Sequence, residues 1–404
     1  MSIASSATAG AVAPPGRAAA PFLAATLVTL MAAAAAPTPL YRLYQQSWGF
    51  SPAMLTVVFA VYALSLLAVL LTAGSLSDHV GRRPVIFAAL LLEILGMGLF
   101  VAAESPSMLI AARIVQGLAT GAATSALAAA LLDSARRHGP LINSLVTPVG
   151  MALGALGTSA LAELAPWPLH LVYILLAGLF VVQAAALWLL PEMTAPRPGA
   201  WASLRPCVAV PPQARAAFLR LSPLNVAIWA LGGFFMSLAP SLVREATGAA
   251  ASLAGGAVVA TFTGAGALSI LALRHRPART ALLSGAILLL AGVAVLAGGV
   301  HLAALPLFLA GALLAGLGWG ASFLGILRAL LPLAGAEERA GLVSAYYIQG
   351  YVALGAPAIA AGMLGRWLGL VVATDIYTAV LLSLAGMGLA LVVLDGRGGQ
   401  ELHP

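Results

Sequence analysis

A charged loop between two apolar runs is the first candidate for chemistry in this chain. Residues 74–84 read Gly-Ser-Leu-Ser-Asp-His-Val-Gly-Arg-Arg-Pro. A glycine permits a turn where a side chain would clash, and the carboxylate of Asp78 can pair with Arg82 or lie near a helix N-terminus. Such a charged clasp can hold two rigid halves together in one state and release them in another. Its expected members are Gly74, Asp78, Gly81, Arg82 and Arg83, although Arg83 alone is equally compatible with an ordinary basic loop.

A second candidate is an arginine inside an apolar run. Arg113 is followed on the same helical face by Gln116, and Gly117 and Gly121 offer a small-residue surface for close helix packing. An arginine within a span costs roughly 2.5–3.5 kcal/mol and usually faces the bundle interior. Because arginine does not release a proton near neutral pH, we expect it to tune a carboxylate or to hold an anionic group. The alternative is that its side chain extends to the outer membrane interface.

Glu93 is the carboxylic acid on which Arg113 would act. Among the 12 acidic residues, it is the one that we place deep inside a span, near the midplane. By helical rise the two residues differ by roughly 6 Å in depth, which two long side chains can bridge. Burial favours the neutral form of a carboxylic acid, so Glu93 is a candidate proton-binding residue. The alternative is a protonated side chain that only forms a hydrogen bond to a neighbouring helix.

Enzymatic and metal chemistry have little support in the sequence. The six histidines fall in loops or at the ends of apolar runs without the spacing of metal ligands. The single cysteine, Cys207, excludes a disulfide framework and a zinc site with several thiolates. The basic residues are all arginine, whereas the phosphate-binding loop of ATPases requires a lysine. We therefore expect no catalytic residue, no metal site, no cofactor and no use of ATP by this polypeptide.

The composition places these side chains in a membrane. Of 404 residues, 62% are hydrophobic and 8% are charged, whereas about a quarter of a soluble domain is charged. A span needs about 20 apolar residues, and backbone groups in lipid are satisfied most simply by helices. We predict an all-α protein with spans at 22–40, 53–74, 85–103, 108–132, 141–164, 169–190, 223–243, 251–273, 281–299, 305–328, 341–364 and 371–394. Pro37 and Pro39 could kink or end the first of these spans.

The arginines indicate the orientation of the spans. If the N-terminus is cytoplasmic, the inner segments contain 15 arginines and the outer loops contain three, namely Arg42, Arg244 and Arg366. This is a strong positive-inside bias. The inner arginines are Arg17, Arg82, Arg83, Arg136, Arg137, Arg197, Arg205, Arg215, Arg220, Arg274, Arg276, Arg279, Arg328, Arg339 and Arg397. Because they are scattered over short loops, the net charge of +7 indicates topology, and a nucleic-acid partner is not expected.

The two halves of the chain resemble each other weakly. Residues 152–155 and 353–356 both read Ala-Leu-Gly-Ala, and residues 117–122 match 316–321 at four of six positions. These matches suggest a duplication with a site between two halves. We predict a disordered cytoplasmic N-tail at 1–21, a six-helix bundle at 22–190, a cytoplasmic linker at 191–222, a second six-helix bundle at 223–394 and a cytoplasmic tail at 395–404.

Three motifs together resemble the major facilitator superfamily. The loop at 74–84 matches the family signature G-x-L-[SA]-D-x-x-G-R-[RK] at every fixed position. Residues 113–117 are similar to a second family motif, R-x-x-Q-G, which occurs in many proton-linked members and is associated there with proton transfer. The resemblance implies that the clasp stabilises an outward-facing form. The loop at 274–279 lacks the aspartate and the glycine, so we expect a one-sided clasp. Residues 150–159 resemble the antiporter motif, but Ala155 replaces its proline.

The resemblance implies a secondary active transporter that works by alternating access. We expect proton-coupled efflux of a drug-like or metabolite molecule; the alternatives are a facilitator or a proton symporter for a small organic solute, and, more remotely, a membrane-embedded enzyme. We expect a monomer in the lipid bilayer of a bacterial inner membrane, with a small-molecule substrate and protons as partners. Residues that would line a central cavity are Tyr62, Trp229, Phe235, Trp319, Phe323, Tyr346 and Gln349.

Overall fold

The part of the chain that the structure describes folds into helices joined by short turns. The computed structural model describes residues 18–135, 137–247, 252–335 and 337–398. The α-helices are α1 (Ala19–Ala35), α2 (Pro37–Trp48), α3 (Pro52–Ala73), α4 (Leu76–Val80), α5 (Arg82–Val101), α6 (Pro106–Ser134), α7 (Gly139–Leu164), α8 (Leu171–Ala186), α9 (Ala200–Ser203), α10 (Pro212–Ser237), α11 (Ala239–Thr247), α12 (Ser252–Leu273), α13 (Ala278–His301), α14 (Leu305–Leu330), α15 (Arg339–Leu368) and α16 (Leu370–Gly398). Two short 3-10 helices follow α8 and α14.

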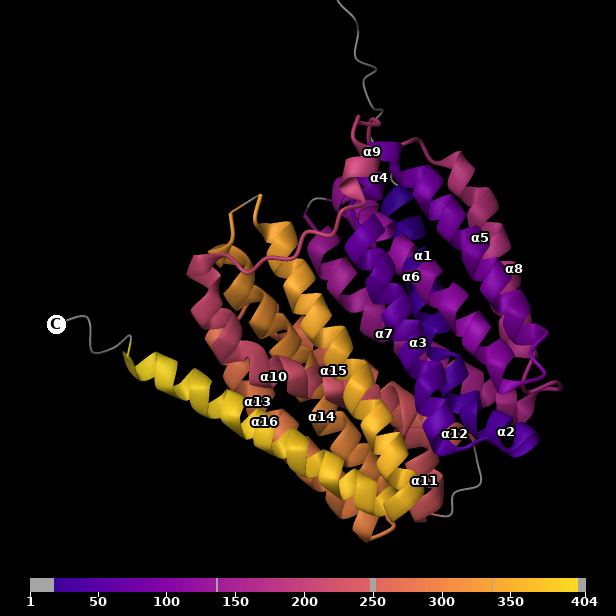
Figure 1. Cartoon of the computed structure of the whole chain (residues 1–404), viewed down its shortest axis with the longest axis vertical. Coiled ribbons are helices and arrows are strands. Elements are labelled where there is room, and N and C mark those ends of the chain that lie inside the picture. The colour runs from indigo at the N-terminus through magenta and orange to yellow at the C-terminus, as the bar shows by residue number, and fades with distance from the viewer. Residues whose placement is uncertain (1–17, 136, 248–251, 336, 399–404) are drawn as a thin grey trace, which may run out of the picture.

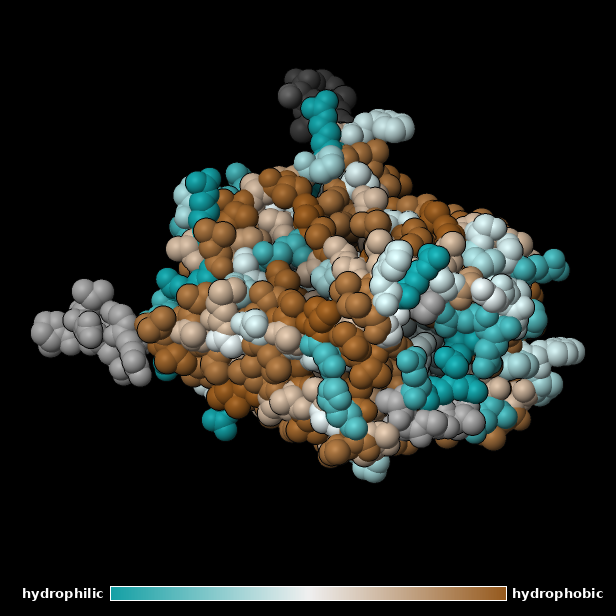
Figure 2. Space-filling view, turned by 60° about the horizontal axis from the view of Figure 1, so that its bottom comes forward, coloured by the Kyte–Doolittle hydropathy of each residue, from teal (hydrophilic) through white to brown (hydrophobic). Residues whose placement is uncertain are grey.

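In the described part of the chain, twelve helical segments are long and apolar enough to cross a membrane, which confirms the predicted number of spans. The first segment joins α1 and α2 over Ala19–Trp48, so Arg42, expected in an outer loop, lies inside a helix. Large apolar side chains remain exposed on the helix surfaces; Val182 is 62% exposed and Leu268 is 61% exposed. Figure 2 shows hydrophobic side chains over much of the visible surface and a group of hydrophilic ones at its lower right.

The helices form two bundles, as the fold class predicted. Figure 1 shows α1, α3 and α5–α8 on one side of the molecule and α10 and α13–α16 on the other, with α12 beside α2. In the first bundle α6 packs against α3 and α5, and in the second bundle α14 packs against α12 and α13. Each bundle has its own buried core, with Leu23 and Phe180 in the first and Leu289 and Phe308 in the second. Polar residues within a span can therefore be buried in the interior of their own bundle.

The ends of several helices differ from the sequence-based expectation. α10 begins at Pro212, inside the predicted linker, because a proline suits the first turn of a helix. At the other end of the chain α16 runs to Gly398, past the predicted start of the tail. An ion pair between Arg220 and Asp395 joins these two helix extensions. The predicted N-tail falls mostly on residues outside the described part of the chain, as do Arg17 and Arg136.

Prolines divide the first helix of each bundle into two parts. The first bundle has its break between α1 and α2, next to Pro37, and the second has its break between α10 and α11, next to Pro240. A proline has no N–H, so the carbonyl four residues before it loses its helical partner. The carbonyl of Met236, four residues before Pro240, instead accepts a hydrogen bond of 2.9 Å from the hydroxyl of Thr38 in the other bundle.

The two bundles meet through α7 with α12 and through α3 with α15. A small apolar cluster of Phe59, Ala155, Met236 and Val259 lies in this interface. A carboxylate oxygen of Glu163, in α7, accepts a hydrogen bond of 3.1 Å from the N–H of Leu253, in α12. We call the end of the molecule that carries α4 and α9 the clasp end, and the end that carries α2 and α11 the closed end. Toward the clasp end the ribbons of α10 and α15 diverge from α3 (Figure 1).

Candidate functional site

The predicted clasp is present within the first bundle. A guanidinium nitrogen of Arg82 lies 2.5 Å from a carboxylate oxygen of Asp78 and donates a hydrogen bond of 2.7 Å to the hydroxyl of Ser77. The Nε of Arg82 lies 3.2 Å from a carboxylate oxygen of Asp133, at the end of α6. Arg82 is only 7% exposed. The clasp therefore ties α4, α5 and α6 together, and its buried cation lies between two carboxylates.

Glu192 completes the clasp, and the sequence analysis missed it. Its carboxylate accepts hydrogen bonds from the backbone N–H groups of Arg82, at 2.8 Å, and Arg83, at 3.2 Å. These N–H groups begin α5 and have no partner within the helix, and an anion at a helix N-terminus is stabilised by the helix dipole. The signal that could have revealed this role is an acidic residue directly after the sixth span. Arg83 instead stacks on Trp188, with its guanidinium carbon 4.7 Å from the ring centroid.

The two clasp glycines have different structural roles. Gly81 has φ +108°, which side chains rarely adopt. A Cβ there would lie 2.9 Å from a carboxylate oxygen of Glu192. Gly81 therefore permits both the turn before α5 and the close approach of the Glu192 carboxylate to the start of that helix. Gly74 was expected to permit close helix approach, but a Cβ at this position would meet the carbonyl of Leu70 in its own helix.

Glu93 lies in the interior of the first bundle. It is 0% exposed, and one of its carboxyl oxygens accepts a hydrogen bond of 2.8 Å from the hydroxyl of Thr120, in α6. Its other oxygen, Oε2, is buried without a hydrogen-bond partner among the described residues. The sequence predicted the burial of Glu93 but expected Arg113 as its partner. The described residues contain no ion pair between the two side chains.

Arg113 is also fully buried, with 0% exposure, which rules out its extension to the membrane interface. One guanidinium nitrogen, Nη1, donates to the carbonyl of Ala34 at 3.2 Å and to the side-chain oxygen of Gln116 at 2.6 Å. The amide of Gln116 donates at 2.9 Å to the carbonyl of Ala33, which lacks its helical partner because Pro37 has no N–H. The guanidinium carbon lies 4.1 Å from the ring centroid of Tyr62.

Small residues bring the neighbouring helices close to this network. A Cβ at Gly117 would lie 2.8 Å from the Cβ of Ser65, and one at Gly121 would lie 2.7 Å from the carbonyl oxygen of Leu66. Both contacts are made with α3. The predicted small-residue packing surface of α6 is therefore confirmed, and it positions Tyr62 next to Arg113.

The remaining predicted cavity residues lie in the second bundle, where aromatic rings form a connected group. The ring centroid of Trp229 lies 6.2 Å from that of Tyr346, 6.0 Å from that of Tyr347 and 4.9 Å from that of Tyr351. Further contacts continue from Tyr346 through Phe323, Trp319 and Phe262 to Phe235. Sequence reasoning had selected Trp229, Phe235, Trp319, Phe323 and Tyr346, and the structure places them in this one group.

A chain of amide hydrogen bonds lies on the same helices. The side-chain amide of Asn225 donates at 2.8 Å to the side-chain oxygen of Gln349, whose own amide donates at 2.8 Å to the hydroxyl of Ser222. Asn225 is 1% exposed and was missed by the sequence analysis, since a single asparagine near the start of a span carries no pattern. The side chain of Gln349, predicted to line a cavity, therefore has its polar partners within the protein.

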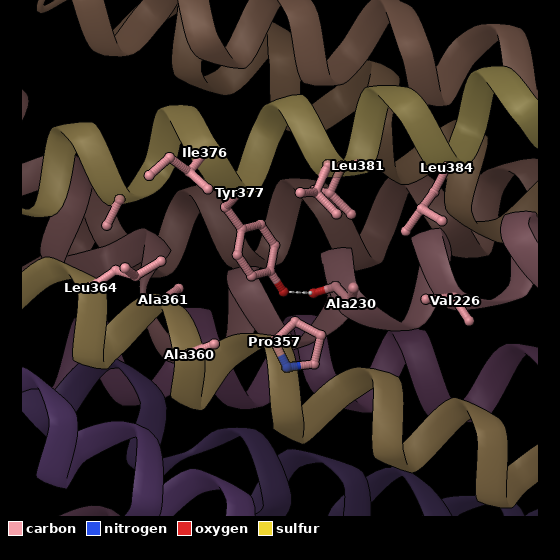
Figure 3. Close-up of a pocket in the computed structure, with 12 residues that line it drawn as sticks. Val226, Ala230, Pro357, Ala360, Ala361, Leu364, Ile376, Tyr377, Leu381 and Leu384 are labelled. Atoms are coloured by element: carbon pink, nitrogen blue, oxygen red, sulfur yellow. Dashed lines mark hydrogen bonds between the residues drawn. The ribbon is translucent and has the colours of Figure 1, made fainter.

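An apolar pocket with a volume of about 140 Å³ lies between α10, α15 and α16. Figure 3 shows its lining: Pro357 and small side chains of α15 face Tyr377 and Leu381 of α16. The hydroxyl of Tyr377 donates a hydrogen bond of 2.7 Å to the carbonyl of Ala230, so the polar atom of this ring already has a partner. None of the predicted cavity residues lines this pocket.

Known relatives match parts of this chain. Multidrug resistance protein MdtL of Shewanella oneidensis is 29% identical over 149 residues, which make up 36% of this chain and 37% of that protein. Cephamycin export protein CmcT of Amycolatopsis lactamdurans is 32% identical over 163 residues, or 39% of this chain and 32% of that protein. The matches therefore span about a third of the length of these relatives.

Solved structures with similar folds cover nearly the whole chain. A mutant form of the nucleoside transporter NupG has a TM-score of 0.70 at 13% identity and covers 92% of this chain and 98% of its own. The human organic anion transporter MFSD10 (TETRAN) has a TM-score of 0.65 at 18% identity, with 93% and 100% covered. At these identities the likeness concerns the fold, and it agrees with the two bundles described above.

The family follows from the sequence as a whole. The predicted resemblance rested on three short motifs, and the structure places two of them in the clasp around the buried Arg82 and in a buried polar network. A model of the Major Facilitator Superfamily matches residues 22–356, which include both motifs and reach into α15 of the second bundle. This chain is therefore a member of the Major Facilitator Superfamily.

Proposed function

We propose that this protein is a secondary active transporter that moves a small molecule by alternating access. The observation that carries the proposal is the unequal contact between the bundles. They are joined at the closed end by the Thr38–Met236 and Glu163–Leu253 hydrogen bonds, while the clasp binds residues of the first bundle and the linker. Such an arrangement corresponds to a state that is open toward the clasp end.

The clasp end faces the cytoplasm in this proposal. Arg82, Arg83, Arg137, Arg274 and Arg276 all lie at this end, as the positive-inside rule requires. Both chain termini are then cytoplasmic, and the membrane is the inner membrane of a bacterium, which agrees with the bacterial sources of the similar proteins. The protein works as a monomer in the bilayer, and its scattered arginines do not form a nucleic-acid surface.

Export coupled to protons is the direction that we propose. Two relatives carry names that describe multidrug resistance and cephamycin export, and the first bundle holds Glu93 as a carboxyl group that can bind and release a proton. Arg113 and Gln116 would set the charge around it. The specific observation that favours the alternative, a facilitator or a proton symporter, is Ala155 in place of the proline of the antiporter motif.

Transport into inside-out vesicles with an imposed pH gradient tests the proposal. The probes are a cationic dye such as ethidium, a nucleoside such as uridine and a cephamycin such as cefoxitin. We expect Glu93→Gln and Arg113→Ala to abolish gradient-driven accumulation of a transported probe, while Glu93→Gln keeps downhill exchange. Asp78→Asn should slow both modes, because the clasp acts on the conformational cycle. The exposed loop variant Glu104→Gln is the control.

Three results would contradict parts of this proposal. Full gradient-driven accumulation by Glu93→Gln would exclude Glu93 from proton coupling. Transport of a probe that no pH gradient alters would replace coupled export by facilitated diffusion. Failure of Asp78→Asn to slow either mode would remove the clasp from the conformational cycle.

A further inference from the structure

Tyr62 lies next to the buried polar residues of the first bundle. Its ring covers the guanidinium of Arg113 at 4.1 Å, and Arg113 lies on the same helix, α6, as Thr120, which is bonded to Glu93. Tyr62 belongs to α3, which packs against α15 of the other bundle. A change at Glu93 can therefore reach the interface through this one side chain.

Glu93 and Arg113 have complementary unpaired atoms. Oε2 of Glu93 and the Nε and Nη2 of Arg113 are buried without a hydrogen-bond partner among the described residues. Both side chains are 0% exposed. Buried polar groups normally have partners, and a bidentate arginine–carboxylate pair is a strong one. The unpaired atoms therefore define a second arrangement in which the two side chains bind each other.

We propose that Tyr62 and the ionised carboxylate of Glu93 compete for the guanidinium of Arg113. The proposal rests on the proposed role of Glu93 in proton coupling. While the carboxyl group is protonated, the Tyr62 ring stabilises the buried cation by a cation–π contact. When the proton leaves to water, the carboxylate pairs with Nε and Nη2 of Arg113, and the ring loses this contact.

The displaced ring would act on the second bundle. Helix α15, which packs against α3, carries Tyr351, and the ring of Tyr351 lies 4.9 Å from that of Trp229. The other titratable side chains near Tyr62 are Arg113, Glu93 and Tyr41. Tyr62 is thus a positioning residue that links the protonation of Glu93 to the contact between α3 and α15 and to the aromatic group of the second bundle.

Infrared titration of the buried carboxyl group tests the competition. The C=O band of protonated Glu93 is identified by its loss in Glu93→Gln, and its pH midpoint is measured in lipid nanodiscs. Tyr62→Leu removes the contact that favours the protonated state, so we expect the midpoint to fall by about 0.4–1.5 pH units. Tyr62→Phe keeps the ring and should keep the midpoint. Phe59→Leu, one turn away in α3, is the matched control.

A fluorinated series covers the case in which Tyr62→Leu does not fold. Mono-, di- and trifluorinated phenylalanine at position 62 weaken the cation–π contact with little change in size, so the midpoint should fall stepwise. An unchanged midpoint across this series, or in folded Tyr62→Leu, overturns the competition while leaving Glu93 as the proton site. A band that does not titrate in the unsubstituted protein overturns both proposals.

A distance measurement tests the link to the bundles. Spin labels replace His138 and Glu337 at the clasp end of the two bundles, in a Cys207→Ser background. We expect the distance between the labels to change with pH in the otherwise unchanged protein and in Tyr62→Phe. In Tyr62→Leu and in the trifluorinated variant, the pH-dependent change in this distance should be at most half as large. A full change in these last variants would exclude Tyr62 as the link.

Discussion

At the scale of single residues, prolines create the binding partners of the polar side chains. Pro37 cannot donate to the carbonyl of Ala33, and the amide of Gln116 takes the place of the missing N–H at 2.9 Å. Gln116 then accepts from Arg113 at 2.6 Å. The proline in one helix and the glutamine in another are therefore parts of one arrangement that fixes the orientation of a buried cation.

Substitution of Gln116 tests the strength of this arrangement. Gln116→Leu removes two buried hydrogen bonds, one of them to a charged group, and leaves Arg113 with fewer partners. We expect a loss of stability of about 2–4 kcal/mol and a clear fall in the thermal unfolding midpoint in detergent. Gln183→Leu is the matched control, because the Gln183 amide donates at 2.9 Å to the uncharged hydroxyl of Thr29. An equal fall in both variants would contradict the special role of Gln116.

The carboxylate of Glu192 gives a second prediction at this scale. Glu192→Ala removes the charged cap of α5, so we expect a loss of about 1–2 kcal/mol. Thermal unfolding should show a lower midpoint, with Glu192→Gln between the alanine variant and the unsubstituted protein. Glu104→Ala, in an exposed loop, should leave the midpoint unchanged. A midpoint for Glu192→Ala equal to that of this control would show that the cap contributes nothing.

At the scale of helices, the corresponding ends of the two bundles are built with opposite charges. At the end of α6, Asp133 accepts from Arg82. At the end of α14, Arg328 instead donates to the backbone carbonyls of Leu273 and Arg276 after α12, at 3.0 and 2.8 Å. In the second bundle, backbone carbonyls thus accept the hydrogen bonds of the arginine at the corresponding loop. This explains why that loop does not need the aspartate of the clasp.

The break between α10 and α11 carries a prediction about the closed end. Pro240→Ala restores an N–H that can pair with the carbonyl of Met236 and compete with Thr38. We expect Pro240→Ala and Thr38→Val each to weaken the contact between the bundles by about 1 kcal/mol, roughly fivefold in favour of opening at this end. Spin labels at Gln45 and Glu245 measure the opened fraction.

A double substitution shows whether the two residues act through the same bond. If they do, Pro240→Ala combined with Thr38→Val should open the closed end little more than either change alone. Additive effects would mean that the Thr38–Met236 hydrogen bond is not the contact that Pro240 makes possible. Thr72→Val, which removes a hydroxyl bonded within α3, is the control.

At the scale of the whole molecule, the positions of the linker and the clasp predict which side is accessible. Cys207 is exposed and lies in the linker between the bundles. Because the clasp end is cytoplasmic in our proposal, a membrane-impermeant maleimide should label Cys207 in inside-out vesicles and not in intact cells. The same labelling of Ser75→Cys, in a Cys207→Ser background, should give the same result. Labelling of either cysteine from outside intact cells would reverse the proposed orientation.

The sequence by itself determined the membrane architecture, because long apolar runs must be helical in lipid. It also determined the ion pair between Asp78 and Arg82, because these two residues lie one helical turn apart in the chain. Only the tertiary structure decided that Glu192 caps α5, that Thr120 binds Glu93, and that Tyr62 covers Arg113. These partners come from distant parts of the chain, so the packing of the helices against one another decides which side chains meet.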